Sequence, residues 1–385
     1  MTKTTGKKIL IMAGGTGGHI FPALSIARQL QTLGFTVEWL GTRKGMEAQL
    51  IPGTGIPLHF ISVSGLRGKS RLSVLLSPFV VTLAILQAMR KILRVKPGCV
   101  LGMGGFVTGP GGIAAWLLRK PLLIHEQNAI AGLSNQLLSP LAAVVMEGFT
   151  GAFERKQELT HNTLLKRICK PGKVVHVGNP LRKEILDCPP PQHRYNKTDS
   201  DRRIRVLVIG GSLGAAAINK VMPELLKEFP AADSLELWHQ CGKNNLASCR
   251  AHYQELGFSE NEHLRVAAFI DDMAAAYCWA DVVICRAGAS TVSEISAIGI
   301  PAVFVPFPHA VDDHQTENAL IMQKSGAAWL VQQHELNPLV LGNILSQLLA
   351  DRKLILEMAL LARRAAKPDA TETAARCCME ACYAC

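Results

Sequence analysis

The stretch Lys8-Ile-Leu-Ile-Met-Ala13, followed by Gly14-Gly-Thr-Gly-Gly18, decides the fold. A short apolar run that ends in glycines predicts a buried strand and a tight loop, and residues 21–33 after it have the pattern of a helix. Further buried strands are predicted at residues 36–40, 99–101 and 121–124. Strands that alternate with helices are typical of βαβ units on a parallel sheet, so an α/β domain begins here.

The same pattern starts again in the second half of the chain. Ile204-Arg-Val-Leu-Val-Ile209 leads into Gly210-Gly-Ser-Leu-Gly214 and a helical segment, residues 215–229. Later strands are predicted at residues 235–238, 281–285 and 302–305. Two doubly wound, Rossmann-like halves, each opening with its own glycine loop, predict two domains that face each other across a cleft.

The expected division of the chain follows from these patterns. Residues 1–187 form the N-terminal domain, the proline-rich residues 188–203 form a linker, and residues 204–350 form the C-terminal domain that binds the substrate nucleotide. Residues 351–385 are expected to form a helical segment that packs back on the N-terminal domain.

The composition excludes a disordered chain, because hydrophobic residues make up 48% and charged residues 18% of the 385 residues. Lys and Arg number 41 against 30 Asp and Glu, which gives a net charge of +11. Residues 1–100 hold 13 basic and 2 acidic residues, so the whole excess lies in the first quarter of the chain. Aromatic residues, at 5%, are few for a protein that stacks single-stranded bases, and no nucleic-acid partner is expected.

Eleven cysteines without a secretory signal predict a reduced, cytosolic chain rather than a disulfide framework. Cys377, Cys378, Cys382 and Cys385 have a loosely metal-like spacing, but no second Cys/His pair at a familiar spacing accompanies them. The expectation for this tail is a solvated helix end, and neither a metal nor a cofactor is predicted.

Residues 72–89 carry no formal charge, and their number would admit a transmembrane helix. Ser77-Pro78 has the form of an N-cap followed by proline at the first helical position, which leaves only 12 residues before Arg90. A membrane span is therefore the least favoured interpretation. Two others stay open: a helix buried in the first domain, or a membrane-surface helix with a basic rim. The rim would consist of Arg67, Lys69, Arg71, Arg90, Lys91 and Arg94.

Both glycine loops suit phosphate groups, because glycines admit a phosphate to the backbone amides of a helix N-terminus. Neither loop has the G-x-G-x-x-G spacing of dinucleotide-binding proteins, and no acidic residue ends the following strand to bind a ribose. Arg43 suits a 2′-phosphate, so an NADP-linked dehydrogenase stays a weaker alternative.

Two residues are candidates for a general base. His19 directly follows the first loop, where a neutral imidazole is able to take a proton from a hydroxyl group. Glu126, in His125-Glu-Gln-Asn128, follows a buried strand and is the second candidate. Capping, packing and turn chemistry are the structural alternatives for these residues.

Glu294 also has two interpretations. Thr291-Val-Ser-Glu294 has the spacing of a capping box, which would account for the carboxylate structurally. A carboxylate at that helix start alternatively accepts hydrogen bonds from both hydroxyls of a ribose. The glycine-bearing segment Arg286-Ala-Gly-Ala-Ser-Thr291 before it favours the ribose role.

Seven motifs occur in a characteristic order: Gly14-Gly-Thr-Gly-Gly-His19, Gly102-Met-Gly-Gly105, His125-Glu-Gln-Asn128, Gly178-Asn-Pro-Leu-Arg182, Gly210-Gly-Ser-Leu-Gly-Ala215, Cys285-Arg-Ala-Gly-Ala-Ser-Thr-Val-Ser-Glu294 and Pro308-His-Ala-Val-Asp-Asp-His-Gln315. As a set, they resemble the MurG family of bacterial peptidoglycan glycosyltransferases from residue 9 to about residue 330. The resemblance implies a GT-B fold, in which the N-terminal domain receives a lipid acceptor and the C-terminal domain binds the nucleotide sugar. It also implies an inverting transfer of N-acetylglucosamine from its UDP donor to the muramoyl 4-hydroxyl of undecaprenyl-diphospho-muramoyl-pentapeptide. This step converts lipid I to lipid II in cell-wall synthesis, and so serves cell shape and cell division.

The resemblance further implies a set of substrate-binding residues. Arg182 and Ser212 are implied for the diphosphate, Ile270 for the uracil, Glu294 for the ribose and Gln315 for the sugar hydroxyls. The remaining implied contacts are Thr16, Gly17, Gly18, Asn128, Ala289, Ser290, Thr291, Val292 and Ser293. Leu213 stands where a glutamine is common in the family, and Ser290 stands where leucine is common.

The expected partners are the UDP-sugar, undecaprenyl-linked lipid I, an anionic membrane surface and other cell-wall synthesis proteins. The expected location is the cytoplasmic side of the cell inner membrane, as a peripheral protein. Two alternatives remain besides the dehydrogenase. One is a GT-B transferase that acts on another membrane lipid, and the other is a non-catalytic basic surface protein.

Overall fold

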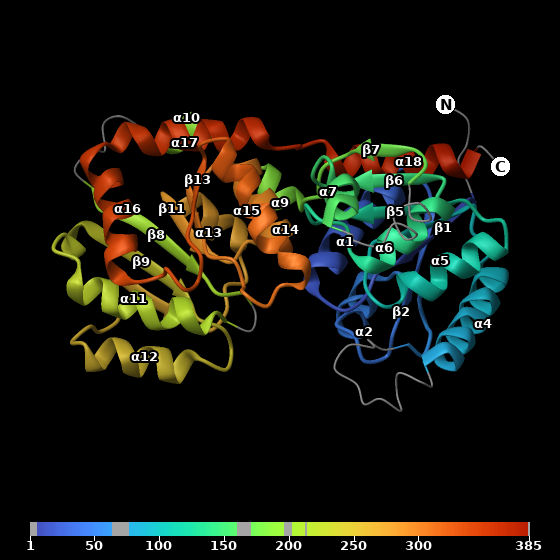
Figure 1. The fold of residues 1–385 in the computed structure, drawn as a ribbon, viewed down its shortest axis with the longest axis horizontal. Coiled ribbons are helices and arrows are strands. Elements are labelled where there is room, and N and C mark those ends of the chain that lie inside the picture. The colour runs from blue at the N-terminus through green and yellow to red at the C-terminus, as the bar shows by residue number, and fades with distance from the viewer. Residues whose placement is uncertain (1–5, 64–76, 160–170, 196–201, 212–213, 384–385) are drawn as a thin grey trace. The chain divides into compact units, whose positions relative to one another are not determined.

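The computed structural model describes residues 6–63, 77–159, 171–195, 202–211 and 214–383. The chain divides into two compact units, each a parallel sheet with helices packed on it (Figure 1). The first unit combines Met1–Arg182 with Lys367–Cys385, and the second is Lys183–Ala366. The chain therefore passes from one unit to the other twice.

The first unit is built on a seven-stranded sheet with the order β3-β2-β1-β4-β5-β6-β7. All adjacent strands in it are parallel. The strands are β1 (Lys8–Met12), β2 (Thr36–Gly41), β3 (Leu58–Phe60), β4 (Cys99–Gly102), β5 (Leu122–Glu126), β6 (Val144–Glu147) and β7 (Val174–His176). The central strands are buried on both faces, which is why their sequences are nearly continuous apolar runs.

Helices cover both faces of this sheet (Figure 1). They are α1 (Gly17–Thr32), α2 (Glu47–Leu50), α4 (Ser77–Val95), α5 (Thr108–Leu117), α6 (Leu133–Leu138), α7 (Ala152–Leu159) and α18 (Ala370–Tyr383), with 3-10 turns at Pro52–Thr54 and Ser139–Leu141. On one face, Ile11 packs in a core with residues of α1 and α18. On the other face, Leu10 packs in a core with residues of α4 and α5.

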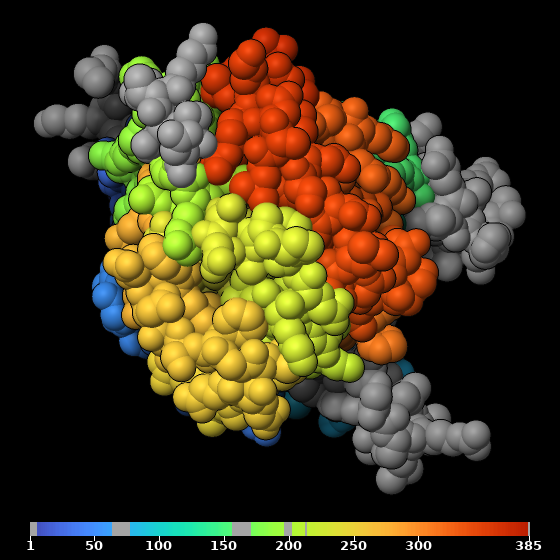
Figure 2. Space-filling view, turned by 90° about the vertical axis from the view of Figure 1, so that its left-hand side faces the viewer, coloured from blue at the N-terminus to red at the C-terminus, as the bar shows by residue number. Residues whose placement is uncertain are grey.

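The second unit contains a six-stranded parallel sheet with the order β10-β9-β8-β11-β12-β13. Its strands are β8 (Ile204–Ile209), β9 (Leu235–Gln240), β10 (Leu264–Ala267), β11 (Val282–Cys285), β12 (Ala302–Phe304) and β13 (Ala328–Leu330). Its helices are α9 (Lys183–Leu186), α10 (Pro191–Arg194), α11 (Ala216–Glu228), α12 (Leu246–Glu255), α13 (Met273–Trp279), α14 (Ala289–Ile298), α15 (His314–Lys324), α16 (Pro338–Ala350) and α17 (Arg352–Ala365), with 3-10 turns at Ala232–Ser234 and Val311–Asp313. On the face of this unit seen in Figure 2, α16 and α17 in red lie beside α11 in yellow-green, and α12 in gold follows.

Both sheets have the strand order of a Rossmann fold, and the prediction of two doubly wound α/β halves is confirmed. The strand order reverses between β1 and β4 in the first unit and between β8 and β11 in the second. Ligands of such sheets bind at the carboxyl ends of the strands at this reversal. Each predicted glycine loop follows the first strand of its unit, and so lies at that point.

The domain boundaries differ from the expected ones. The first unit ends at Arg182 rather than at residue 187, because α9 packs against α13 and α14 of the second unit. Within the expected linker, α10 packs against α17, and residues 196–201 lie outside the described residues. Residues 351–385 do not form one segment, since α17 packs against α14 in the second unit whereas α18 packs against α1 in the first.

Two of the tail cysteines belong to a core, so the expectation of a solvated helix end was wrong for α18, while Cys385 lies outside the described residues. Cys378 and Cys382 are buried on α18, and the Sγ atom of Cys99 on β4 lies 3.1 Å from that of Cys382. Ala374 and Ala375 share the buried face of the helix. Alanine and cysteine are small and apolar, so α18 can pack closely on α1 and β4.

Helix α4 is described from Ser77 to Val95, and because residues 64–76 lie outside the described residues, the N-cap at Ser77 stays a prediction. One face of α4 is packed, with Ala84, Ala88 and Ile92 fully buried. The other face carries the exposed apolar side chains of Phe79, Val80, Leu83, Leu86 and Leu93. Among the helices that the structure describes, none combines the length and the apolar character that a membrane span requires.

Candidate active site

Two glycine loops pack against each other at the carboxyl ends of β1 and β4. Gly104 and Gly105 have φ angles of +96° and +82°, a region that residues with a side chain rarely adopt. A Cβ atom on Gly104 would meet the ring of His19, and one on Gly105 would collide with the carbonyl oxygen of Gly14. The missing side chains therefore allow the loop after β4 to contact the start of α1.

The buried carboxylate of Glu47 holds the first glycine loop in place. It accepts hydrogen bonds from the backbone N–H of Gly15 at 3.1 Å and from the backbone N–H of Thr42 at 2.7 Å. The hydroxyl of Thr42 donates to it as well, at 2.8 Å. Glu47 was not predicted from the sequence, because an isolated glutamate in a polar stretch gives no sign that it is buried.

His19 lies half-buried in the first turn of α1, and its Nδ1 atom is 3.0 Å from Oε1 of Gln127. The Nε2 group of Gln127 donates to the backbone carbonyl oxygen of Met103 at 2.9 Å. A carbonyl oxygen is able only to accept, so this end of the Gln127 side chain is its NH₂ group. The Oε1 atom of Gln127 is therefore an acceptor, so Nδ1 of His19 carries the proton. This tautomer leaves the lone pair on Nε2, where a neutral imidazole acts as a base.

Glu126, the second candidate base, is 2% exposed at the end of β5. One of its oxygens accepts from the backbone N–H and the side-chain amide of Asn128, at 3.0 and 3.1 Å. The other accepts from the backbone N–H of Gly132 and from Nδ2 of Asn135, both at 2.9 Å. Four donors occupy the two oxygens, so this carboxylate organises the loop after β5, and the geometry favours His19 as the base.

The motif Gly178-Asn-Pro-Leu-Arg182 is tied to the same loop. Nε2 of His125 donates to the carbonyl oxygen of Gly178 at 2.9 Å, and burial lowers the pKa of this imidazole to about 4. Nδ2 of Asn179 donates to the backbone carbonyl of Gln127 at 3.0 Å. These bonds set the position of Gln127, and through it the position of His19.

The first unit gathers several predicted contact residues at the start of α1. Thr16 is the N-cap residue with an extended backbone, and Gly17 and Gly18 form the first turn. No acidic residue stands in that turn, so the positive end of the helix dipole suits an anion. The guanidinium of Arg182 lies 5.7 Å from the ring centroid of Phe21, one turn further along α1.

In the second unit, α14 begins at Ala289 with Gly288 as its N-cap residue. Thr291 is thus the third residue inside the helix, and the predicted capping box is wrong because its first member does not cap. The carboxylate of Glu294 instead accepts a hydrogen bond from the hydroxyl of Tyr277 on α13 at 3.2 Å. The capping explanation for Glu294 is thereby removed, and the ribose interpretation stays a prediction.

The side chains at the start of α14 differ in their accessibility. Ala289 and Val292 are buried, so their side chains pack inside the unit. The half-buried ones are Ser290, Thr291, Ser293 and Glu294. Nδ2 of Asn318 on α15 donates to the carbonyl oxygen of Ala287 at 3.0 Å and so holds the loop before α14.

Gln315 lies half-buried in the first turn of α15, and its Oε1 accepts from the backbone N–H of Phe307 at 3.0 Å. The structure therefore brings Gln315 to the same edge of the sheet as the start of α14. Ile270 is buried in the loop after the edge strand β10. Ser212 and Leu213 lie outside the described residues, while Nε2 of Gln240 donates to the carbonyl oxygen of the preceding Gly211 at 3.1 Å.

Comparisons with known proteins agree with this geometry. The model of the glycosyltransferase family 28 N-terminal domain matches residues 9–147, and that of the family 28 C-terminal domain matches residues 205–374. A protein of Marinobacter nauticus named UDP-N-acetylglucosamine–N-acetylmuramyl-(pentapeptide) pyrophosphoryl-undecaprenol N-acetylglucosamine transferase is 51% identical over 381 residues, which cover 99% of each chain. A protein of Pseudomonas entomophila with the same name is 48% identical over 97% of this chain and 98% of its own.

Solved structures extend the similarity to the whole fold. The crystal structure of MurG from Acinetobacter baumannii is 40% identical, covers 97% of this chain and all of its own, and superposes with a TM-score of 0.79. The resemblance that the sequence motifs indicate is thus confirmed. The chain belongs to glycosyltransferase family 28 as a member of the MurG family, with the GT-B fold of two Rossmann-like domains.

Proposed function

We propose that this protein is an N-acetylglucosaminyltransferase of peptidoglycan synthesis. It transfers N-acetylglucosamine from UDP-N-acetylglucosamine to the muramoyl 4-hydroxyl of undecaprenyl-diphospho-muramoyl-pentapeptide, and thereby converts lipid I to lipid II. The full-length identity of 51% to the Marinobacter nauticus transferase carries this proposal. The position of His19 at the start of α1 supports it, because the transfer requires a base at the carboxyl edge of the sheet.

His19 is the proposed general base. The acceptor hydroxyl donates to Nε2, and its proton passes to this atom while the oxygen attacks the anomeric carbon of the sugar. Nδ1–H remains bonded to Oε1 of Gln127, which stabilises the imidazolium that forms. The bond between the anomeric carbon and the diphosphate oxygen breaks, its electron pair leaves with UDP, and the single displacement inverts the anomeric centre.

The second unit is proposed to hold the donor. No acidic residue stands in the first turn of α14, so its N-terminus stabilises negative charge on the leaving diphosphate. Glu294 accepts hydrogen bonds from the ribose hydroxyls, and Tyr277 orients its carboxylate. The other proposed donor contacts of the second unit are Ser212 for the diphosphate, Ile270 for the uracil and Gln315 for the sugar. The proposed contacts that belong to the first unit are Arg182 for the diphosphate, and Thr16, Gly17, Gly18 and Asn128.

Transfer of labelled N-acetylglucosamine to a short-chain lipid I analogue tests the function. We expect wild-type protein to form the disaccharide product, and His19→Ala to lower turnover by about 10²–10⁴-fold while UDP still binds. Transfer to diacylglycerol but not to the lipid I analogue would overturn the proposed acceptor and favour a transferase for another membrane lipid. Full turnover by His19→Ala would overturn the assignment of the base.

The acceptor carries a polyprenyl chain, so the proposal includes a peripheral position on the cytoplasmic side of the inner membrane. We define the α4–α5 apolar surface as the exposed side chains of Phe79, Leu83, Leu86, Leu93, Trp116 and Leu117 on these two adjacent helices. Exposed apolar surfaces of this kind mark contacts with membranes or proteins. Arg90 and Arg94 lie exposed on α4 beside it, which suits anionic headgroups.

A further inference from the structure

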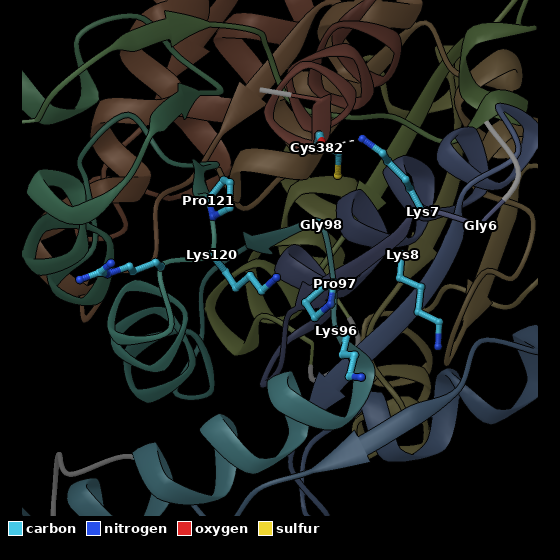
Figure 3. Close-up of a pocket in the computed structure, with 10 residues that line it drawn as sticks. Gly6, Lys7, Lys8, Lys96, Pro97, Gly98, Lys120, Pro121 and Cys382 are labelled. Carbon is cyan, nitrogen blue, oxygen red and sulfur yellow. Dashed lines mark hydrogen bonds between the residues drawn. The ribbon is translucent and has the colours of Figure 1, made fainter. Parts of the chain in front are cut away.

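A basic cavity of about 350 Å³ lies at the amino ends of β1, β4 and β5 in the first unit (Figure 3). Five cationic residues line it: Lys7, Lys8, Lys96, Arg119 and Lys120. They come from the three segments that enter these neighbouring strands, so the sheet itself gathers them. Figure 3 shows Lys96 and Lys120 on either side of Pro97, with Lys7 turned toward Cys382.

The residues that the structure describes supply little negative charge to this cavity. Nζ of Lys8 lies 3.0 Å from Glu38, which is also bonded to His59. Lys7 donates to the carbonyl oxygen of Cys382 at 2.8 Å, a contact that neutralises no charge. Among the residues that the structure describes, Glu38 is the only carboxylate that forms an ion pair with any of the five. Cations that line one cavity repel one another, and an anion bound between them would offset this repulsion.

Two of the cationic residues occupy backbone positions with positive φ angles, which glycine usually occupies. Lys96 follows α4 with φ +52°, and Arg119 follows α5 with φ +53°. Backbone hydrogen bonds impose this left-handed geometry, from Lys96 N–H to the carbonyl of Ile92 at 2.8 Å and from Arg119 N–H to that of Trp116 at 2.9 Å. Glycine is the usual residue at such helix ends. The turns therefore do not require the long cationic side chains that both positions place beside the cavity.

We propose that the basic cavity binds a phosphate-bearing ligand at a site separate from the candidate active site. The glycine loops lie at the carboxyl ends of the strands, and the cavity lies at the amino ends, about 16 Å away along a five-residue strand. Clustered ammonium and guanidinium groups form charge-assisted hydrogen bonds with phosphate oxygens. The proposal is independent of the transferase activity, because no residue of the cavity is assigned to that reaction.

Isothermal titration calorimetry with inorganic pyrophosphate tests the site, using the full chain with UDP added to saturation. We expect wild-type protein to bind one pyrophosphate, and the double variant Lys96→Gly/Arg119→Gly to bind it about tenfold more weakly or worse. Glycine suits both φ angles, so the variant should keep the melting temperature of the wild type. If the two cations served only to stabilise the helix C-termini, the double variant would instead have a lower melting temperature and unchanged pyrophosphate binding. That result would overturn the proposal.

The matched control is Lys227→Gln/Lys324→Gln, which removes the same two charges from exposed positions on α11 and α15. We expect this control to bind pyrophosphate like the wild type. An equal loss in the control would overturn the proposal, because net charge rather than the cavity would then explain the binding. Lys120→Gln, outside the left-handed turns, supplies a second variant that should also weaken binding should the double variant not fold.

Vesicles distinguish the two sources of phosphate. If the ligand is a lipid headgroup, Lys96→Gly/Arg119→Gly should bind less well to phosphatidylcholine vesicles that contain phosphatidylglycerol, and pyrophosphate should compete with them. If the ligand is a free phosphate compound, vesicle binding should be equal in wild type and variant while pyrophosphate binding is still lost. Both results support a phosphate site, whereas unchanged binding of pyrophosphate and of vesicles overturns it.

Discussion

Gln127 is a positioning residue, since it contacts His19 rather than a proposed substrate atom. We expect Gln127→Leu to lower kcat by about tenfold, equivalent to about 1.4 kcal/mol, because the imidazole loses its orientation and its fixed tautomer. The KM for the UDP-sugar should change much less. Steady-state kinetics of Gln127→Leu in the wild-type and His19→Ala backgrounds measure the coupling. An equal loss in both backgrounds would contradict a role that acts through His19.

Glu294 does not have the capping role that its sequence context suggests, and its carboxylate accepts a hydrogen bond from Tyr277. Its substitution tests the proposed ribose contact. We expect Glu294→Gln to weaken UDP binding by roughly tenfold to a hundredfold, because hydrogen bonds to a charged acceptor contribute about 1.5–3 kcal/mol. Calorimetric titration with UDP measures this change. Tyr277→Phe is the control, since it leaves the carboxylate in place and should cost less affinity. Unchanged UDP affinity in Glu294→Gln would exclude the ribose contact.

At the scale of the element, α4 combines the two interpretations that its sequence left open. One face is packed in the core, and the opposite face contributes to the α4–α5 apolar surface. We expect Phe79→Ser to weaken binding to anionic vesicles by about tenfold, because burial of a Phe side chain contributes about 1.5–3 kcal/mol. Co-sedimentation measures binding, and UDP titration should show that the variant is folded.

Leu339→Ser on α16 is the matched control for Phe79→Ser. Leu339 is 71% exposed and Phe79 is 74% exposed, so both substitutions remove accessible apolar surface of similar kind. The control should bind vesicles like the wild type. Equal losses in the two variants would show that the α4–α5 apolar surface has no special role in membrane binding. Arg90→Glu/Arg94→Glu should weaken binding at low salt and have less effect at high salt.

At the scale of the whole molecule, each unit contains a buried histidine that is neutral when folded. Burial lowers the pKa of His125 to about 4 in the first unit and that of His239 to about 3 in the second. In an unfolded chain the value is about 6.5. Below pH 6.5 the unfolded chain therefore binds protons that the folded chain does not. The stability that these groups contribute is complete above that pH and is lost as the pH falls.

We expect the free energy of unfolding to decrease by about 2 kcal/mol for each of these histidines between about pH 7 and pH 5. His239→Gln should remove the part of this decrease that is due to His239. Urea unfolding, followed by tryptophan fluorescence at the two pH values, measures the free energy of unfolding. The control is His334→Gln, whose side chain is 80% exposed and should leave the acid sensitivity unchanged. The same pH dependence in both variants would contradict the assignment to His239.

The linear pattern of residues was sufficient for the architecture. Short runs that are almost entirely apolar, such as β1 and β8, specify strands buried on both faces, and glycines after them specify the loops at the sheet edge. These signals are local, so the doubly wound halves and eight of the thirteen strands that the structure describes could be predicted, whereas β3, β6, β7, β10 and β13 were not. The family was predicted from the order of the seven motifs. His19 was predicted as a candidate base in the same way, because its place after the first glycine loop is visible in the sequence, and this role stays a prediction.

Only the tertiary structure decided what the polar residues around that loop do. Gln127 meets His19 across 108 positions of sequence, and Glu47 meets Gly15 across 32. Hydrogen bonds from Asn128 and Gly132 to Glu126 favour a loop-organising role over that of a base, and the observed start of α14 removed the capping box. The hydrogen-bond partner of a polar side chain depends on which strands become neighbours in the sheet, and the burial of that side chain depends on which helices and loops pack on the sheet. Both depend on residues far apart in the sequence, so no pattern of adjacent residues could specify these roles.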